Sequence, residues 1–457
     1  MHGKTTMRMP TAESQRTGTF VSCLRIRKLF GYFDYDIQPK PKAEEAFKTL
    51  VVLYGLNGTG KTTILRLLYH LLSPRERAGH KSFAAKTKFQ LFQIGLSDGT
   101  EITASRPAAT DGPFTLSLRR PGGKTILHEF RTVGKPPTIL PDPREPRTYG
   151  DLLAALESLG YTFYYLADDR TFSIEPEDLP RRRFIQHESV EPGMRYLSRL
   201  PEREDREGIV QALEQALSRF NMFVSRQASY QSRTGAAFTH SVYADVITRI
   251  VKRPTRGRRS PVGSLDDQVS QLRAIAADSA VLETYGLSTR VDVEPLIKTI
   301  EKAPASRQRI ARELLSPYLG ALDQRFGELR LLHDLIHSFV GHLSTYLAPK
   351  KVLFSVQDGL VLLSPSGDRL SADMLSSGER HLLLIMCNTC IATSSHTLFI
   401  IDEPEISLNI VWQRTLLSTL LDMAAGSTVQ FLLASHSIPL VTQHRTHVVE
   451  LSQVAGE

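Results

Sequence analysis

Residues 55–62 read GLNGTGKT, a run of glycines that ends in a lysine and a threonine. This spacing fits G-x-x-x-x-G-K-[ST], in which backbone N–H groups wrap nucleotide phosphates, the lysine bridges the β- and γ-phosphates and the threonine hydroxyl binds Mg²⁺. Apolar runs before and after it predict the strand and the helix that such a loop requires. The residues expected to contact ATP are Gly55, Asn57, Gly58, Gly60, Lys61, Thr62 and Thr63, and Thr62 is expected to bind Mg²⁺ as well.

Two adjacent acids follow a second apolar run, in TLFIIDEPE near the end of the chain. Leu398 to Ile401 predict a buried strand that ends in Asp402 and Glu403. Asp402 suits the Mg²⁺ shell, and Glu403 suits the orientation or deprotonation of an attacking water. Acidic pairs at strand ends also arise by chance, but a lysine loop early in the chain and an acid-ending strand late in it are typical of P-loop ATPases.

The stretch LSSGERHLLL predicts a helix that opens on a Ser-Ser-Gly turn. Its exposed N–H groups, serine hydroxyls and helix dipole offer a second phosphate-binding geometry at Ser376, Ser377, Gly378 and Glu379. A simpler interpretation is a capping box between the first serine and the glutamate. The phosphate-binding and capping interpretations are compatible if the turn contacts a phosphate that is bound by a neighbouring subunit. His436, in LLASHS, is placed to reach a γ-phosphate, although a lone histidine there is more often structural.

In their order along the chain, GLNGTGKT, LSSGE, LFIIDEPE, SLN and ASHS resemble the motifs of ABC-type ATPases, with LSSGE similar to the LSGGQ signature. The interval of 315 positions between Lys61 and Ser376 resembles the SMC- and RecF-like branch and not the transporters. The stretches LRIRKLFGYFDYDI and YYLADDRTFSIE look like the compact ATPase subunits of bacterial anti-phage defence modules, such as the Septu, PARIS and retron-associated systems.

This resemblance implies two chains that pair head to tail, each ATP being held by the glycine-rich loop of one chain and the signature of the other. It implies that Ser376 and Gly378 face the γ-phosphate in trans, that Glu403 is the catalytic base, and that His436 is a catalytic switch histidine. It also assigns the D-loop to Ser407–Asn409, where Asn409 departs from the acid or histidine often found.

The Q-loop glutamine of the ABC pattern has no clear counterpart in the sequence. Gln90 and Gln93 lie in an early predicted hairpin, which is too soon in the chain. Asp168 or Arg170 follows the strand after which such a loop would lie.

Periodicity predicts the elements that position these motifs. The expected elements are strands within 20–39, a hairpin within 88–106 that turns at Asp98-Gly99, mostly loop with a strand or two over 107–149, a helix and a strand within 149–170, helices within 204–226, 265–285 and 293–347, and a hairpin around Asp358-Gly359. The predicted fold class is therefore α/β, an ABC-type P-loop ATPase domain with a mostly α-helical insertion. The expected divisions are a disordered leader at 1–18, an N-terminal ATPase lobe at 19–180, the insertion at 181–347 and a C-terminal lobe at 348–457.

Composition limits the class of protein. The 457 residues carry a net charge of +8, which is compatible with an acidic partner without requiring one. Cys387 and Cys390 offer two of the four ligands of a structural zinc site and lie in an apolar helical run, so buried packing is expected. With no run of 18 apolar residues and a polar N-terminus, we expect a cytoplasmic protein without a membrane partner.

Duplex DNA is a candidate partner because of two basic runs, RIVKRPTRGRRS at 249–260 and the three arginines at 181–183. Solvated loops are a slightly favoured alternative for each run. Aromatic residues are not interleaved with these charges, which argues against stacking on single-stranded bases.

Two functions remain open from the sequence, and two more are less favoured. The first is an ATP-hydrolysing subunit of an antiviral defence system, acting as a homodimer or higher oligomer. Only 21 residues follow His436, so we expect a separate effector or toxin protein to act with it. The second is an ATP-gated scaffold that sequesters a toxic partner with little turnover. A DNA-repair ATPase or a transporter subunit is less favoured, and the long insertion speaks against the transporter.

Overall fold

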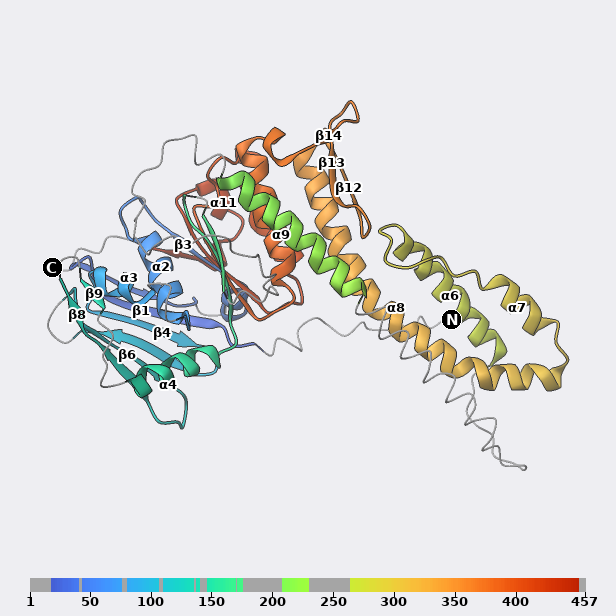
Figure 1. Cartoon of the computed structure of the whole chain (residues 1–457), viewed down its shortest axis with the longest axis horizontal. Helices are drawn as coiled ribbons and strands as arrows, with labels where there is room; N and C mark the ends of the chain where they lie inside the picture. The colour runs from blue at the N-terminus through green and yellow to red at the C-terminus, as the bar shows by residue number, and fades with distance from the viewer. Residues whose placement is uncertain are drawn as a thin grey trace, which may run out of the picture. The chain divides into compact units, whose positions relative to one another are not determined.

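The computed structural model describes residues 18–40, 43–75, 80–106, 110–134, 137–139, 146–169, 171–175, 208–229 and 264–451. These residues form two compact units, one from the chain up to residue 213 together with residues from 376 onward, and the other from 214–375. Figure 1 colours the elements of both units along the chain. Residues 1–17 of the expected leader and both basic runs lie outside the described residues.

A largely parallel sheet forms the centre of the first unit. Its strands in spatial order are β11 (Phe172–Glu175), β10 (Thr162–Leu166), β15 (Thr397–Asp402), β16 (Val429–Ser435), β3 (Leu50–Tyr54) and β17 (Val448–Glu450). All pairings are parallel except that of β10 with β11. Asp402 pairs with Ala434, and Ala434 in turn pairs with Leu53. The carboxyl ends of β15, β16 and β3 therefore meet at one edge of the sheet, where α/β proteins commonly bind ligands.

A second, antiparallel sheet lies in the same unit (Figure 1). Its strands in spatial order are β2 (Phe33–Ile37), β1 (Val21–Leu29), β4 (Leu91–Leu96), β5 (Glu101–Ser105), β6 (Phe114–Arg119) and β7 (Ile126–Phe130). The early hairpin is confirmed, since β4 and β5 pair on either side of Asp98-Gly99. One buried apolar cluster joins side chains of both sheets with those of α2 (Lys61–Leu72), including Ile26 of β1, Leu68 of α2 and Ile400 of β15.

The expectation of mostly loop over 107–149 is wrong. The structure places β6, β7, the short strands β8 (Thr132–Val133) and β9 (Thr138–Ile139), and the start of α4 (Pro146–Glu157) in this stretch. Most of the glycines and prolines lie between these elements, with Pro146 opening α4, whereas β6 alternates buried and partly exposed residues as a sheet strand does. Composition therefore masked a period-two pattern that the sequence FTLSLR carries.

The second unit is mainly helical, with a small sheet. Residues 208–229 are helical, and they are followed among the described residues by α6 (Leu265–Glu283), α7 (Glu294–Glu301) and α8 (Ala305–Leu347). Phe220 packs against Phe339 of α8 and Phe354 of β12, with ring centroids 4.5 and 5.6 Å away. The hairpin around Asp358-Gly359 is confirmed as β12 (Lys351–Ser355) and β13 (Gly359–Leu363), and β14 (Arg369–Leu370) adds a third strand.

A buried polar cluster closes the far end of α2, the helix that begins at the glycine-rich loop. Lys81 Nζ, from α3 (His80–Lys86), donates to the carbonyl oxygens of His70, Leu71 and Ser73, each at 2.9 Å. His70 Nδ1 lies 2.8 Å from His80 Nδ1 in a shared hydrogen bond. Burial, followed by the neighbouring His80, lowers the pKa of His70 to about 3.

This lowered pKa predicts a pH-dependent loss of stability. The unfolded chain protonates His70 near its ordinary pKa of about 6.5, while the folded chain does not do so until about pH 3. The free energy of unfolding therefore falls as the pH drops below about 6.5. Between about pH 6.5 and 5, we expect the free energy of unfolding, measured with urea, to fall by roughly 1 to 2 kcal/mol less in His70→Gln than in the wild type. Equal pH slopes in the two proteins would contradict this.

Candidate functional site

The lysine of the glycine-rich loop lies between its own loop and the acidic strand end. Lys61 is 5% exposed, and its Nζ donates to the carbonyl oxygens of Gly55 at 2.8 Å and Leu56 at 3.1 Å. The same ammonium lies 3.9 Å from Glu403 Oε1. β3 and α2 flank the loop as the motif requires, so a buried positive charge is fixed at the edge where the central strands end.

Two glycines of this loop adopt a backbone that other residues rarely adopt. Gly58 and Gly60 have φ of +86° and +87°. A Cβ atom on Gly60 would lie 2.8 Å from Leu29 Cδ2, so the Leu29 side chain would have to shift to make room for it. Asn57 and Gly58 are exposed, and Thr63 is half-buried in the first turn of α2.

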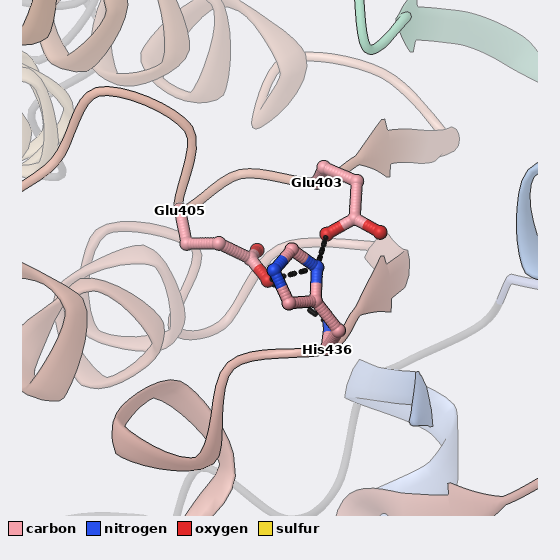
Figure 2. Close-up of side chains that lie close together, drawn as sticks. All are labelled: Glu403, Glu405 and His436. Atoms are coloured by element: carbon pink, nitrogen blue, oxygen red, sulfur yellow. Dashed lines mark hydrogen bonds and ion pairs between the residues drawn. The ribbon is translucent and has the colours of Figure 1, made fainter. Parts of the chain in front are cut away.

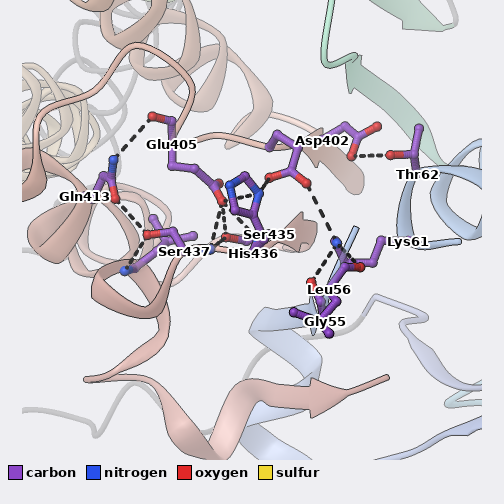
Figure 3. A network of polar contacts seen from close by, with 12 residues as sticks. Gly55, Leu56, Lys61, Thr62, Asp402, Glu405, Gln413, Ser435, His436 and Ser437 are labelled. Atoms are coloured by element: carbon purple, nitrogen blue, oxygen red, sulfur yellow. Dashed lines mark hydrogen bonds and ion pairs between the residues drawn. The ribbon is translucent and has the colours of Figure 1, made fainter. Parts of the chain in front are cut away.

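The two expected Mg²⁺ ligands, Thr62 and Asp402, are in direct contact. Thr62 Oγ1 donates to Asp402 Oδ1 at 3.0 Å (Figure 3). Asp402 is buried, and burial raises its pKa to about 6. Within the described part of the chain, Asp402 Oδ2 is buried without a hydrogen-bond partner. A hydroxyl beside a buried carboxylate with one unused oxygen is a donor set that suits Mg²⁺.

The strand next to β15 brings a further carboxylate to this edge. β10 pairs in parallel with β15 up to Leu166 and Ile401, and Asp168 follows two residues later. The negative charge of Asp168 contributes to the raised pKa of Asp402. Gln93 pairs instead with Arg25 and Thr103 inside the antiparallel sheet. Arg170 lies outside the described residues.

The second acid of the strand end contacts the histidine that the sequence singled out. Glu403 Oε2 accepts a hydrogen bond from His436 Nδ1 at 2.7 Å (Figure 2). Glu403 has a φ of +50°, which turns its side chain away from the strand direction. Burial and the nearby carboxylate of Glu405 raise the pKa of Glu403 to about 7. The carboxylate is thus tied to the histidine on one side and to Lys61 on the other.

Glu405, the second glutamate of D-E-P-E, is a site residue that the sequence motifs do not predict. It is buried, and its Oε1 lies 3.5 Å from His436 Nδ1. The only sequence signal was the acid itself, two positions after Glu403, which is common on surfaces as well.

The signature turn forms the capping box that the sequence predicted. Ser376 Oγ accepts from the backbone N–H of Glu379 at 3.3 Å, and Glu379 Oε2 accepts from the N–H of Ser376 at 2.8 Å, at the start of α9 (Ser377–Ala392). Ser376 and Ser377 are exposed residues at the N-terminus of a long helix. Cys387 and Cys390 are buried in this helix, which confirms the packing interpretation.

The 407–409 segment, the expected D-loop, packs directly on the turn at Ser376–Gly378. The Cα of Gly378 stands so close to the 407–409 segment that a Cβ atom would lie 2.4 Å from the Ser407 carbonyl oxygen. Asn409 accepts from the N–H of Trp412 at 2.9 Å and caps α10 (Ile410–Met423). The asparagine that departs from the ABC pattern therefore has a local structural role.

Residues 219–442 match the family model described as "AAA domain, putative AbiEii toxin, Type IV TA system". The match covers just under half of the chain and includes the signature, the acidic strand end and His436. No curated protein matches the chain. Among the described residues, no helix has the length and apolar character needed to cross a membrane.

Several solved structures resemble the chain at low identity. One is the Smc head domain with an extended coiled coil bound to the C-terminal domain of ScpA, from Pyrococcus furiosus, with 10% identity, a TM-score of 0.37 and coverage of 94% of this chain and 93% of that one. Another is the SmcHead bound to the C-winged helix domain of ScpA, with 9% identity, a TM-score of 0.36 and coverage of 94% and 93%. A third is the Smc head domain with a coiled coil and joint from Pyrococcus yayanosii, with 11% identity, a TM-score of 0.35 and coverage of 96% of both chains. The geometry and the family match together support an ATPase with an α/β P-loop fold.

The contact between Gly378 and Ser407 generates a prediction about stability. Gly378→Ala forces the D-loop or α9 to move and is expected to lower the free energy of unfolding by about 1 to 3 kcal/mol. The matched control is Gly341→Ala within α8, where a Cβ atom meets nothing within 4 Å. That change is expected to be neutral or stabilising by up to about 1 kcal/mol, because alanine favours helix. Equal effects in chemical unfolding would show that the contact is not tight.

Proposed function

We propose that this chain is an ATPase that binds Mg²⁺-ATP at the glycine-rich loop and hydrolyses it with Glu403 as the general base. The observation that carries the proposal is the meeting of Lys61, the Thr62–Asp402 pair and the Glu403–His436 pair at one edge of the parallel sheet. Each group has a distinct task in phosphoryl transfer to water, and the five side chains come from three strand ends.

Charge complementarity supports the binding step. The loop backbone between Gly55 and Lys61 and the start of α2 present N–H groups and the positive end of a helix to a phosphate chain. The ammonium of Lys61 is held within the same loop by two carbonyl oxygens. Thr62 and Asp402 supply oxygen ligands for Mg²⁺, which when bound neutralises charge on the phosphates.

The surroundings of Glu403 support the hydrolysis step. A general base is most effective when its pKa is near the working pH, and burial with a neighbouring carboxylate raises that of Glu403 to about 7. Its Oε2 is held by His436 Nδ1, which orients the carboxylate at the strand end. In this proposal Glu403 accepts a proton from the attacking water, and His436 contacts the γ-phosphate.

Exposed apolar residues around the motifs support a composite site shared by two chains. Four large apolar side chains are exposed beside the glycine-rich loop, the D-loop and the histidine, namely Leu56, Ile410, Val411 and Ile438. Apolar groups around a polar site suit a surface that another protein covers. With Ser376 and Ser377 also exposed, we propose a head-to-tail homodimer in which the signature of each chain meets ATP bound to the other.

We further propose that this ATPase regulates a separate effector in anti-phage defence. The supporting points are the sequence resemblance to defence ATPases and the family description, which names a putative toxin of a type IV toxin–antitoxin system. Phage protection in cells that express the chain with its neighbouring genes is expected to disappear with Glu403→Gln. Retained protection would remove hydrolysis from the proposed role.

Two single variants separate ATP binding from hydrolysis. Lys61→Ala removes a charge-assisted contact to phosphate and is expected to weaken ATP binding by roughly 10- to 100-fold in calorimetric titration. Glu403→Gln retains the shape of the base and is expected to leave ATP affinity within about twofold while lowering kcat by roughly 10²- to 10⁴-fold. Tight ATP binding with no turnover in the wild type would favour the scaffold function instead.

Mixing two inactive proteins tests the composite site. Lys61→Ala disables the glycine-rich loop, and Ser376→Arg blocks the signature of the other chain. Each protein alone is expected to be inactive, while an equal mixture regains ATP turnover because half of the mixed dimers' sites combine two intact halves. A mixture that stays inactive, although both proteins dimerise, would contradict sharing in trans.

A further inference from the structure

The Glu405 carboxylate has hydrogen-bond partners that the proposed function does not yet explain. Its Oε1 accepts from Ser435 Oγ at 2.5 Å and from the backbone N–H groups of His436 and Ser437, each at 3.0 Å (Figure 3). All three donors belong to the turn that leaves β16 and carries the histidine. The side chain of Glu405 is only 5% exposed, so the contacts are shielded from water.

These contacts hold the backbone of the 435–437 turn in place. Two successive backbone N–H groups and one hydroxyl converge on a single oxygen atom, an arrangement that suits a negative charge. Ser435 Oγ also accepts from the N–H of Ser437 at 3.0 Å, and Ser437 Oγ donates to Gln413 Oε1 at 2.7 Å. Removing the carboxylate leaves donors in a buried setting without their acceptor.

The imidazole of His436 is oriented by the same arrangement. Its Nδ1 lies 2.7 Å from Glu403 Oε2 and 3.5 Å from Glu405 Oε1, so the ring stands between two carboxylates (Figure 2). A carboxylate accepts hydrogen bonds, so the ring is held by both ionised acids when its Nδ1 carries the proton. The side chain as a whole is 51% exposed, so these contacts, and not packing, hold the ring in place.

We propose that Glu405 is a positioning residue that acts through His436: it anchors the 435–437 turn and so fixes where the imidazole stands relative to the reacting phosphate. The inference rests on the proposed ATPase function for its consequence in catalysis. The dependence of the 435–437 turn on Glu405 can be tested without ATP turnover.

A double-mutant cycle tests the catalytic consequence. Glu405→Ala is expected to lower kcat by up to about 10²-fold with ATP affinity nearly unchanged, since a misplacement of about 1 Å can cost that much. In a His436→Ala background, the same change is expected to lower kcat by less than about threefold, because its effect passes through the missing histidine. If the kcat loss of the double variant equals the product of the losses in the two single variants, the proposal is overturned.

Two further variants separate positioning from loss of fold. Glu405→Gln keeps an oxygen acceptor for the turn and is expected to retain more kcat than Glu405→Ala. Glu175→Gln is the matched control, since Glu175 is an equally buried carboxylate that accepts from Tyr69 and Ser73 at the other end of α2. It is expected to alter the unfolding midpoint without the effect on kcat. A kcat loss in Glu175→Gln as large as that in Glu405→Ala would overturn the proposal, because it would show a general effect of lost buried charge.

A measurement without turnover separates this inference from the ATPase proposal. In protein with ¹⁵N-labelled histidine, the imidazole signals of His436, assigned with His436→Gln, are expected to show a protonated Nδ1 in the wild type and in Glu405→Gln. In Glu405→Ala the chemical shifts of these nitrogens are expected to move towards the average of the two imidazole tautomers. Unchanged signals would overturn the positioning role. A Glu405-dependent signal in a protein that hydrolyses no ATP would leave the positioning role standing and overturn the proposed function.

Discussion

The parallel register of β3, β16 and β15 is the constraint on which the site depends. Strands that run in the same direction end at the same edge, so three segments far apart in the sequence deliver their following residues to one place. The glycine-rich loop follows β3, the two acids close β15, and the histidine turn follows β16. A shift of one residue in this register would turn Asp402 to the opposite face of the sheet.

Bringing these groups together buries their charges, which is unfavourable. Specific hydrogen-bond partners in the local structure offset this cost. Lys61 is satisfied by carbonyl oxygens of its own loop, and Asp402 by Thr62. Glu403 is held by His436, whose turn is in turn held by Glu405. Burial, followed by neighbouring carboxylates, raises the pKa values of both acids at the strand end. A site arranged in this way suits an anionic ligand that arrives with a divalent cation.

The elements that the sequence predicted best are those with uninterrupted periodicity. The strands at 50–54 and 397–402 and the helix after Lys61 follow from apolar runs bounded by glycine, acids or proline. β6 and β7 could not be placed individually, because the glycines and prolines of that stretch favoured mostly loop with a strand or two. Among the site residues, the capping box at Ser376 could be predicted because its partners are three residues apart. The role of Glu405 could not, since its donors lie about 30 positions away and only the sheet brings them together.

The central claim is that two chains of this protein share an ATP-hydrolysing site. Steady-state phosphate release, measured against protein concentration with Glu403→Gln as the control, tests it most directly. We expect the rate per chain to rise with concentration, to level off once the dimer has formed, and to collapse in the variant. A rate per chain that does not change with concentration, or a near-zero rate despite tight ATP binding, would contradict the account.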